Sequence, residues 1–137
     1  MHRRALILAG LLLPLGAEAA RADIPPAAPV TPIRFRPGAS SATVGGRVRG
    51  YDTALFSVSV RQGQTLTVNL RPSNRNLMFS IRNPRRATVS DGTMRDGQTV
   101  SLVAEMAGAY EIMVFFMRNE ARRGARSTFS LTAAVTG

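Results

Sequence analysis

The residues that decide the fold are YEIMVFFM (110–117), RNEARRGAR (118–126) and TFSLTAAV (128–135). In the first and last of these segments side chains alternate at a period of two, which is typical of half-buried β-strands. Met117 and the middle segment together hold four arginines and one carboxylate in ten residues. So charged a segment crosses the surface rather than the interior. The sequence therefore predicts a cationic loop that is held at both ends by a sheet.

The same alternation recurs upstream and predicts further strands. They are expected at residues 33–36, 42–49, 54–60, 65–70, 77–81 and 100–104. RQGQ (61–64) predicts a hairpin between two of them, and Gly45-Gly46 favours a β-bulge. Residues 87–98 contain two closely spaced Asp-Gly turn signals, which allow one short strand or an irregular excursion. Residues 110–117 are apolar on both faces, so we expect a central strand that is covered on both sides.

Seven or eight short strands without a helical period predict an all-β fold, a single antiparallel β-sandwich at residues 31–137. The core is predicted from the inward-facing positions of these strands. These positions are Phe56, Val58, Leu66, Val68, Phe79, Ile112, Val114, Phe116, Phe129 and Leu131.

The first 22 residues have the pattern of a secretory signal peptide. A basic start at 2–4 precedes an apolar run at 5–16, and Ala20-Arg21-Ala22 matches a cleavage site, with cleavage after Ala19 as an alternative. The apolar run is too short to span a bilayer. Residues 23–30 are rich in proline and alanine and predict a disordered leader. We therefore expect an exported, periplasmic protein without a membrane anchor.

The composition of the mature chain excludes much catalytic chemistry. Cleavage after Ala22 removes three arginines and one glutamate, which lowers the formal charge from +10 to +8. It also removes His2, and the remainder contains no His, Cys, Lys or Trp. Catalysis by Ser–His–Asp or Cys–His groups, His- or Cys-based zinc sites and Schiff-base lysines are thus excluded. We expect no enzyme, cofactor or metal, although two carboxylates facing each other in a cleft would reopen a glycosidase alternative.

Two blocks of the mature chain resemble the periplasmic inhibitors of g-type lysozyme. One block is FRPGASSA (35–42), continued by Gly46, GYD (50–52) and QGQ (62–64); the other is GAYE (108–111) followed by RNEAR (118–122). Residues 72–98 do not match the inhibitors. The Gln-Gly-Gln and Gly-x-Tyr pieces also occur in pre-peptidase C-terminal modules, which are secreted β-sandwiches.

The resemblance implies inhibition by insertion of a loop into the substrate groove of g-type lysozyme. In that family a tyrosine after the second strand and the two arginines of the R-N-x-A-R loop contact the enzyme. These positions match Tyr51, Arg118 and Arg122 here, and we add Asn119 and Glu120 to the candidate partner-binding residues. We expect Glu120 to pair with a neighbouring arginine and shape the loop.

We expect the remaining arginines to lie outside this interface. Arg123 and Arg126 fall outside the matched motif and are interpreted as solvated. Arg82, Arg85 and Arg86, with Arg75 nearby, form a second basic cluster. Few aromatic residues are available to stack bases, so nucleic acid is not expected. The cluster keeps one alternative open: a pre-peptidase-like module that binds cell-wall polysaccharide, lipopolysaccharide or other anionic envelope polymers.

Overall fold

The structure, a computed structural model, describes residues 28–90 and 98–137. The described strands are β1 (Val30–Pro32), β2 (Ser41–Arg49), β3 (Ala54–Val60), β4 (Thr65–Pro72), β5 (Leu77–Arg82), β6 (Thr88–Ser90), β7 (Thr99–Val103), β8 (Gly108–Phe116) and β9 (Arg126–Thr136). One short helix, α2 (Arg118–Arg122), joins β8 to β9. The predicted signal peptide and all but the last three residues of the predicted leader lie outside the described residues.

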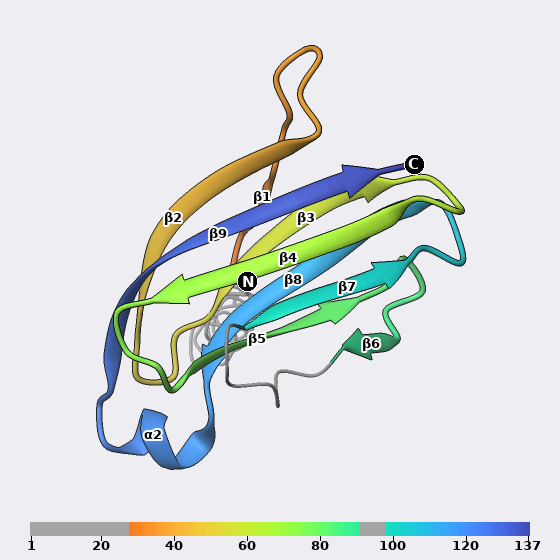
Figure 1. Ribbon diagram of the computed structural model, residues 1–137. Helices are drawn as coiled ribbons and strands as arrows, with labels where there is room; N and C mark the ends of the chain where they lie inside the picture. Colours follow the sequence, from red (N-terminus) through yellow and green to blue (C-terminus); the bar gives the residue numbers. More distant parts are fainter. Residues whose placement is uncertain (1–27, 91–97) are drawn as a thin grey trace, which may run out of the picture.

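The strands form two sheets packed face to face (Figure 1). One has the order β1-β3-β8-β5-β6 and the other the order β2-β9-β4-β7. All pairs are antiparallel except β1 with β3. The predicted all-β sandwich is confirmed. It has nine described strands rather than seven or eight, because Thr88–Ser90 adds a short edge strand in the segment whose turn signals allow one.

The core lies between the inner faces of the sheets. All ten predicted core positions are buried. Phe56 and Phe129 meet across the layers with ring centroids 6.1 Å apart and nearly perpendicular planes. Burial of each large aliphatic side chain contributes about 1.5–3 kcal/mol, so the sandwich needs no disulfide for its core.

The expected bulge at Gly45-Gly46 is absent, and this prediction was wrong. β2 pairs with β9 in unbroken register from Ser41 to Arg49. A Cβ on Gly46 would lie 2.9 Å from the Phe129 ring. The glycine therefore makes room for an aromatic ring on the inner face, and it does not interrupt the strand.

The central strand of the five-stranded sheet is β8, as predicted, but it is not covered on both sides. Its inner residues are buried, whereas Met113 and Phe115 on the outer face are half-buried and lie outside the core cluster. The register places Met113 beside Leu55 and Phe115 beside Met78. The second apolar face is thus a narrow strip whose side chains shield one another within the sheet.

The predicted hairpin at residues 61–64 is wrong. β3 and β4 lie in different sheets, so this connection crosses from one layer to the other. The Arg61 N–H donates to Gln64 Oε1 (2.7 Å), while Ala104 and the 63–64 backbone exchange bonds of 2.8 Å. Alternation cannot separate the two cases, because strands that face each other across a core have the same pattern as strands that pair.

The first strand also differs from its predicted position. β1 ends at Pro32, and Ile33 donates one further backbone bond to Ser57 O (2.8 Å). A proline is tolerated there because β1 is an edge strand. The Asp-Gly turn signals at 91–92 and 96–97 lie outside the described residues. No helix in the described part of the chain is long and apolar enough to cross a membrane.

Candidate functional site

The predicted cationic loop is located where expected, but its centre is the one-turn helix α2. Gly124 has φ +74°, its N–H donates to Ala121 O (3.0 Å), and the Ala125 N–H donates to Glu120 O (3.2 Å). These bonds form a Schellman motif, which ends the helix at a left-handed glycine. Ala121 is buried in the core cluster. The turn is therefore fixed to the sandwich by one side chain and closed by its own backbone.

The polar side chains of α2 point outward. Arg118, Asn119 and Arg122 are all exposed. Glu120 is less exposed and pairs with Arg123 at 3.9 Å, one turn further along. The expectation that Glu120 pairs with a neighbouring arginine is confirmed. The pair leaves Arg118 and Arg122 free of an ion pair among the described residues.

Tyr51 lies at the same end of the sandwich as α2. The turn that carries it is closed by a bond from Asp52 N–H to Arg49 O (3.1 Å). The Gly50 N–H donates to Ala125 O (2.8 Å), which ties this turn to the segment after α2. Tyr51 is 68% exposed. The structure thus gathers the sequence-predicted site residues, which are about 70 positions apart in the chain, at what we call the α2 end.

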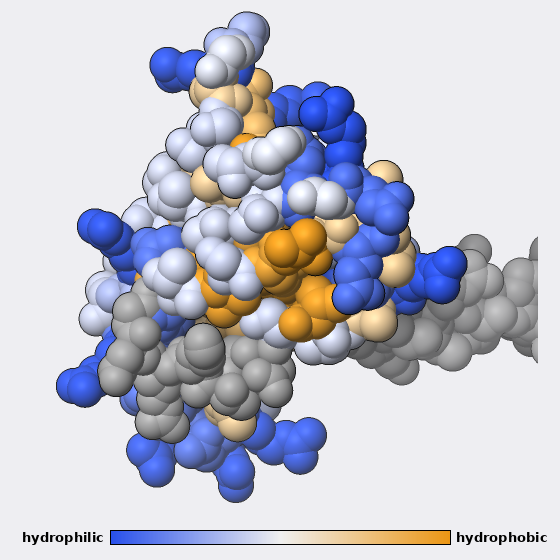
Figure 2. Space-filling view, turned by 45° about the vertical axis from the view of Figure 1, so that its right-hand side comes forward, coloured by the Kyte–Doolittle hydropathy of each residue, from blue (hydrophilic) through white to orange (hydrophobic). Residues whose placement is uncertain are grey.

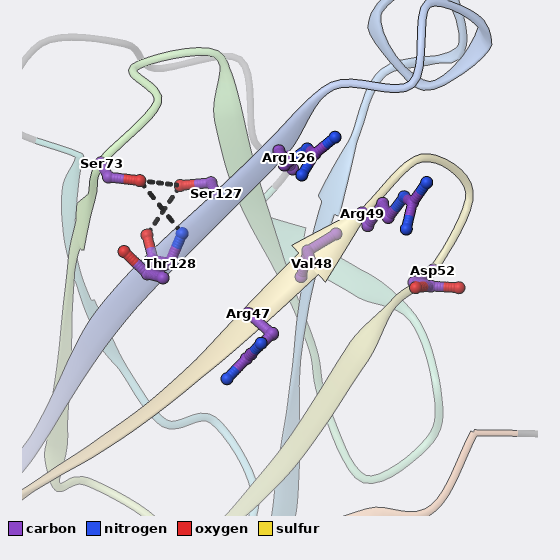
Figure 3. A pocket seen from close by; sticks show the side chains of 8 residues that line it. All are labelled: Arg47, Val48, Arg49, Asp52, Ser73, Arg126, Ser127 and Thr128. Atoms are coloured by element: carbon purple, nitrogen blue, oxygen red, sulfur yellow. Dashed lines mark hydrogen bonds between the residues drawn. The ribbon is translucent and has the colours of Figure 1, made fainter.

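A pocket of about 440 Å³ adjoins the α2 end (Figure 3). β2 contributes Arg47, Val48 and Arg49, and Asp52 and Ser73 come from two turns. The start of β9 completes the lining with residues 126–128. Sequence reasoning missed this pocket, although the i, i+2 spacing of Arg47 and Arg49 already placed both on one strand face.

The second basic cluster lies at the opposite end. Arg85 and Arg86 occupy the turn between β5 and β6, which Asn83 closes by accepting the Arg85 and Ala87 N–H groups through its side chain. Arg82 ends β5, whereas Arg75 precedes the start of that strand. The predicted grouping of Arg75 with the others is therefore wrong, because the length of β5 separates them. We call this region the hairpin end.

Apolar residues are exposed near the hairpin end. The edge strands β6 and β7 carry Val89 and Val103, which are 44% and 62% exposed. Both line a pocket with Leu102 and Met106. Figure 2 shows an apolar patch framed by hydrophilic residues on this side of the molecule. The α2 end, by contrast, exposes only Tyr51 and Met117 among the large apolar side chains of the described residues.

No catalytic pair of carboxylates is brought together in the described pockets. Asp52, Glu105 and Glu111 each line a different pocket, and a fourth pocket has no carboxylate. Within residues 28–90 and 98–137, no group of three or more His, Cys, Asp or Glu residues is placed to hold a metal ion. The exposed arginines of the α2 end offer hydrogen-bond donors and positive charge, which suits recognition of an anionic surface.

Comparison with solved structures finds proteins that this chain matches over nearly their whole length. The periplasmic g-type lysozyme inhibitor PliG of Aeromonas hydrophila is 29% identical, with a TM-score of 0.69 over 78% of this chain and 96% of PliG. PliG of Salmonella Typhimurium is 25% identical, with a TM-score of 0.60 over 78% of this chain and 97% of that protein. The resemblance to g-type lysozyme inhibitors is confirmed.

Two further comparisons delimit this result. A mutant of Escherichia coli PliG is 25% identical, with a TM-score of 0.61 over 80% of this chain and all of that protein. The pre-peptidase C-terminal domain of Bacillus anthracis collagenase is 11% identical and covers similar shares (80% and 99%, TM-score 0.61), so it shares the fold alone. No protein-family model and no curated protein matches this chain.

Proposed function

We propose that this chain is a periplasmic protein inhibitor of g-type lysozyme, exported by a signal peptide that is cleaved after Ala22 or Ala19. The observation that carries the proposal is the Gly50–Ala125 hydrogen bond, which holds the Tyr51 turn beside the segment that follows α2. The same positions carry the sequence resemblance to the inhibitors. Similarity to three PliG structures over almost their full length supports it.

The exposed donors of α2 suit the chemistry of a lysozyme groove. A glycosidase needs a carboxylic acid of raised pKa that protonates the leaving glycosidic oxygen. A guanidinium placed against that carboxyl group forms a charge-assisted pair and holds it ionised. Arg118 and Arg122 supply this group, and Asn119 lies exposed between them. A loop in the groove also excludes the sugar.

The remaining predicted residues have supporting roles. Tyr51 is a rigid, amphipathic side chain of the kind that dominates interface energetics. Glu120 holds Arg123 to one side and shapes the turn. The Schellman motif, the buried Ala121 and the Gly50–Ala125 bond fix the backbone before any partner arrives. Little ordering entropy is then lost on docking, which favours affinity.

We also propose that the protein is not an enzyme. The mature chain has no His, Cys or Lys to act as a base or nucleophile. Each described pocket has at most one carboxylate, whereas glycoside hydrolysis needs two at a defined separation. The proteins of known function that it resembles at 25–29% identity are inhibitors.

The test is an assay of cell-wall lysis with the purified mature chain. We expect inhibition of g-type lysozyme that reaches completion near a one-to-one ratio, and little effect on c-type lysozyme. Sedimentation with peptidoglycan and with lipopolysaccharide serves as the comparison. Full lysozyme activity at micromolar excess of the protein would overturn the proposal, and strong pelleting without inhibition would favour an envelope-binding module.

A further inference from the structure

The outer face of the four-stranded sheet carries two arginines directly opposite each other. In the register of β2 with β9, Arg49 pairs with Arg126 and Arg47 pairs with Thr128. Like charges at directly opposed positions of an antiparallel pair are destabilising. Figure 3 shows that Arg49 and Arg126 extend toward the same side of the strands, while Arg47 points away from them.

This repulsion is not relieved within the described chain. Within the described residues, 28–90 and 98–137, the one ion pair is that of Arg123 with Glu120. Asp52 lines the pocket but lies beyond salt-bridge distance of either arginine. Arg49 and Arg126, at opposed positions and without a counter-ion among the described residues, form what we call a cationic fork. A carboxylate placed between them can accept hydrogen bonds from both guanidinium groups.

The backbone beneath this fork is held rigidly. Ser127 is buried, and its hydroxyl group donates to Thr128 O (2.7 Å) and accepts the Asn74 N–H (3.0 Å). Ser73 accepts the Thr128 N–H through its hydroxyl group (3.0 Å) and donates its own N–H to Thr128 O (2.9 Å). These bonds tie the start of β9 to the turn after β4, so Arg126 projects from a fixed position.

The fork is continuous with the α2 end. Arg49 immediately precedes Gly50, and Arg126 immediately follows Ala125, the two residues joined by the 2.8 Å backbone bond. A partner that covers Tyr51 and α2 therefore reaches the outer face of this sheet at Arg49 and Arg126. The pair thus lies at the border of the proposed interface, outside the R-N-x-A-R motif.

We propose that Arg49 and Arg126 form a second anchor, which binds a carboxylate side chain on the rim of the lysozyme groove. This inference rests on the proposed function and extends it to residues that the motif does not contain. The bound carboxylate supplies a negative charge that no described residue of the free protein places within salt-bridge distance of this pair. Arg49 and Arg126 then become determinants of which lysozymes are inhibited, since only an enzyme with an acidic rim satisfies both.

The test uses Arg49→Gln and Arg126→Gln in the full mature chain. Each substitution should raise the inhibition constant about tenfold, as loss of a charge-assisted contact does. Neither should lower the melting temperature, because each relieves the repulsion between the two arginines. Arg61→Gln is the matched control, because it removes the same charge from an arginine that is exposed at the other end of the sandwich. It should leave inhibition unchanged.

The outcomes separate this inference from the proposed function. A wild-type protein that does not inhibit lysozyme would overturn both the proposed function and the second anchor. Undiminished inhibition by the two variants, beside a wild type that inhibits, would overturn the second anchor alone. A fall in melting temperature that parallels the loss of inhibition would show a structural role instead. Thermal unfolding in acetate and in chloride at equal ionic strength adds a check without lysozyme. Acetate should stabilise the wild type more than the Arg49→Gln and Arg126→Gln variants, and equal stabilisation of all three proteins would contradict a carboxylate site.

Discussion

The two ends of the sandwich both present arginines on well-defined backbone, yet they are built differently. At the hairpin end, Arg85 and Arg86 belong to one local turn, which the Asn83 side chain closes. At the α2 end, α2, the Tyr51 turn and the start of β9 meet through backbone bonds from distant parts of the chain. Both ends carry arginines, so arginine content alone does not distinguish them. What distinguishes the α2 end is that long-range contacts bring an exposed aromatic side chain together with several cationic groups.

The largest test of this difference is removal of single arginines from each end. Arg118→Ala and Arg122→Ala should each weaken inhibition of g-type lysozyme by about 2 kcal/mol or more, as buried charged anchors do. Arg85→Ala, at the hairpin end, should cost almost nothing. Inhibition constants from lysis assays measure all three. Equal losses at both ends would show that general positive charge, rather than the α2 end, provides the affinity.

Arg118→Lys sharpens the same test. Lysine keeps the charge but lacks the planar fork that grips a carboxylate through two hydrogen bonds. We expect a loss of inhibition smaller than that of Arg118→Ala but still measurable. Full activity of the lysine variant would show that Arg118 acts through charge alone.

Much of the fold was predictable, because burial imposes a period of two on every strand. The ten predicted core residues are buried for this reason. The pattern records which face of a strand is buried, but it does not identify the neighbouring strand. The pattern around 61–64 therefore predicts a hairpin, although this connection joins two sheets. The helix α2 escaped prediction because five residues are too few to show a helical period.

The candidate site was predictable only in part. Its arginine motif is contiguous in sequence, and the resemblance identified Tyr51 as a further candidate. The proximity of Tyr51 to α2, however, depends on the Gly50–Ala125 bond. The position of Arg126 opposite Arg49 depends on the register of β2 with β9. Neither contact leaves a local pattern, so the sequence alone predicts a solvated Arg126.

A smaller effect is expected when the backbone of α2 is strained at its C-terminal end. Gly124 has φ +74°, and a Cβ added there would meet no atom within 4 Å. Gly124→Ala therefore adds backbone strain without a clash, at a cost of about 1 kcal/mol. Because the Schellman motif positions Arg118 and Arg122, inhibition should weaken by several-fold. Thermal unfolding and the lysis assay measure the two effects separately.

The matched control for Gly124→Ala is Gly108→Ala at the hairpin end. Gly108 has φ +144°, and its Cβ would lie 2.7 Å from Pro84 Cγ, so the substitution combines strain with overpacking. The expected destabilisation is on the order of 2 kcal/mol. Inhibition measured well below the melting temperature should nevertheless remain unchanged. Loss of inhibition in this variant would mean that the two ends are coupled through β8.

The smallest expected effect concerns Glu120, the one carboxylate of the α2 segment. Its pair with Arg123 is long, at 3.9 Å, and Arg123 is 74% exposed, so the ion pair is worth only a few tenths of a kcal/mol. Glu120→Gln keeps the backbone carbonyl that accepts the Ala125 N–H and so keeps the Schellman motif. Stability and inhibition should both change by less than about 0.5 kcal/mol, and Arg123→Gln should behave alike.

Inhibition that weakens tenfold in Glu120→Gln, but not in Arg123→Gln, would show that Glu120 contacts a donor on the lysozyme. Inhibition that strengthens in both would contradict the shaping role as well. It would show that the pair restricts the approach of Arg118 and Arg122 to the acidic groove.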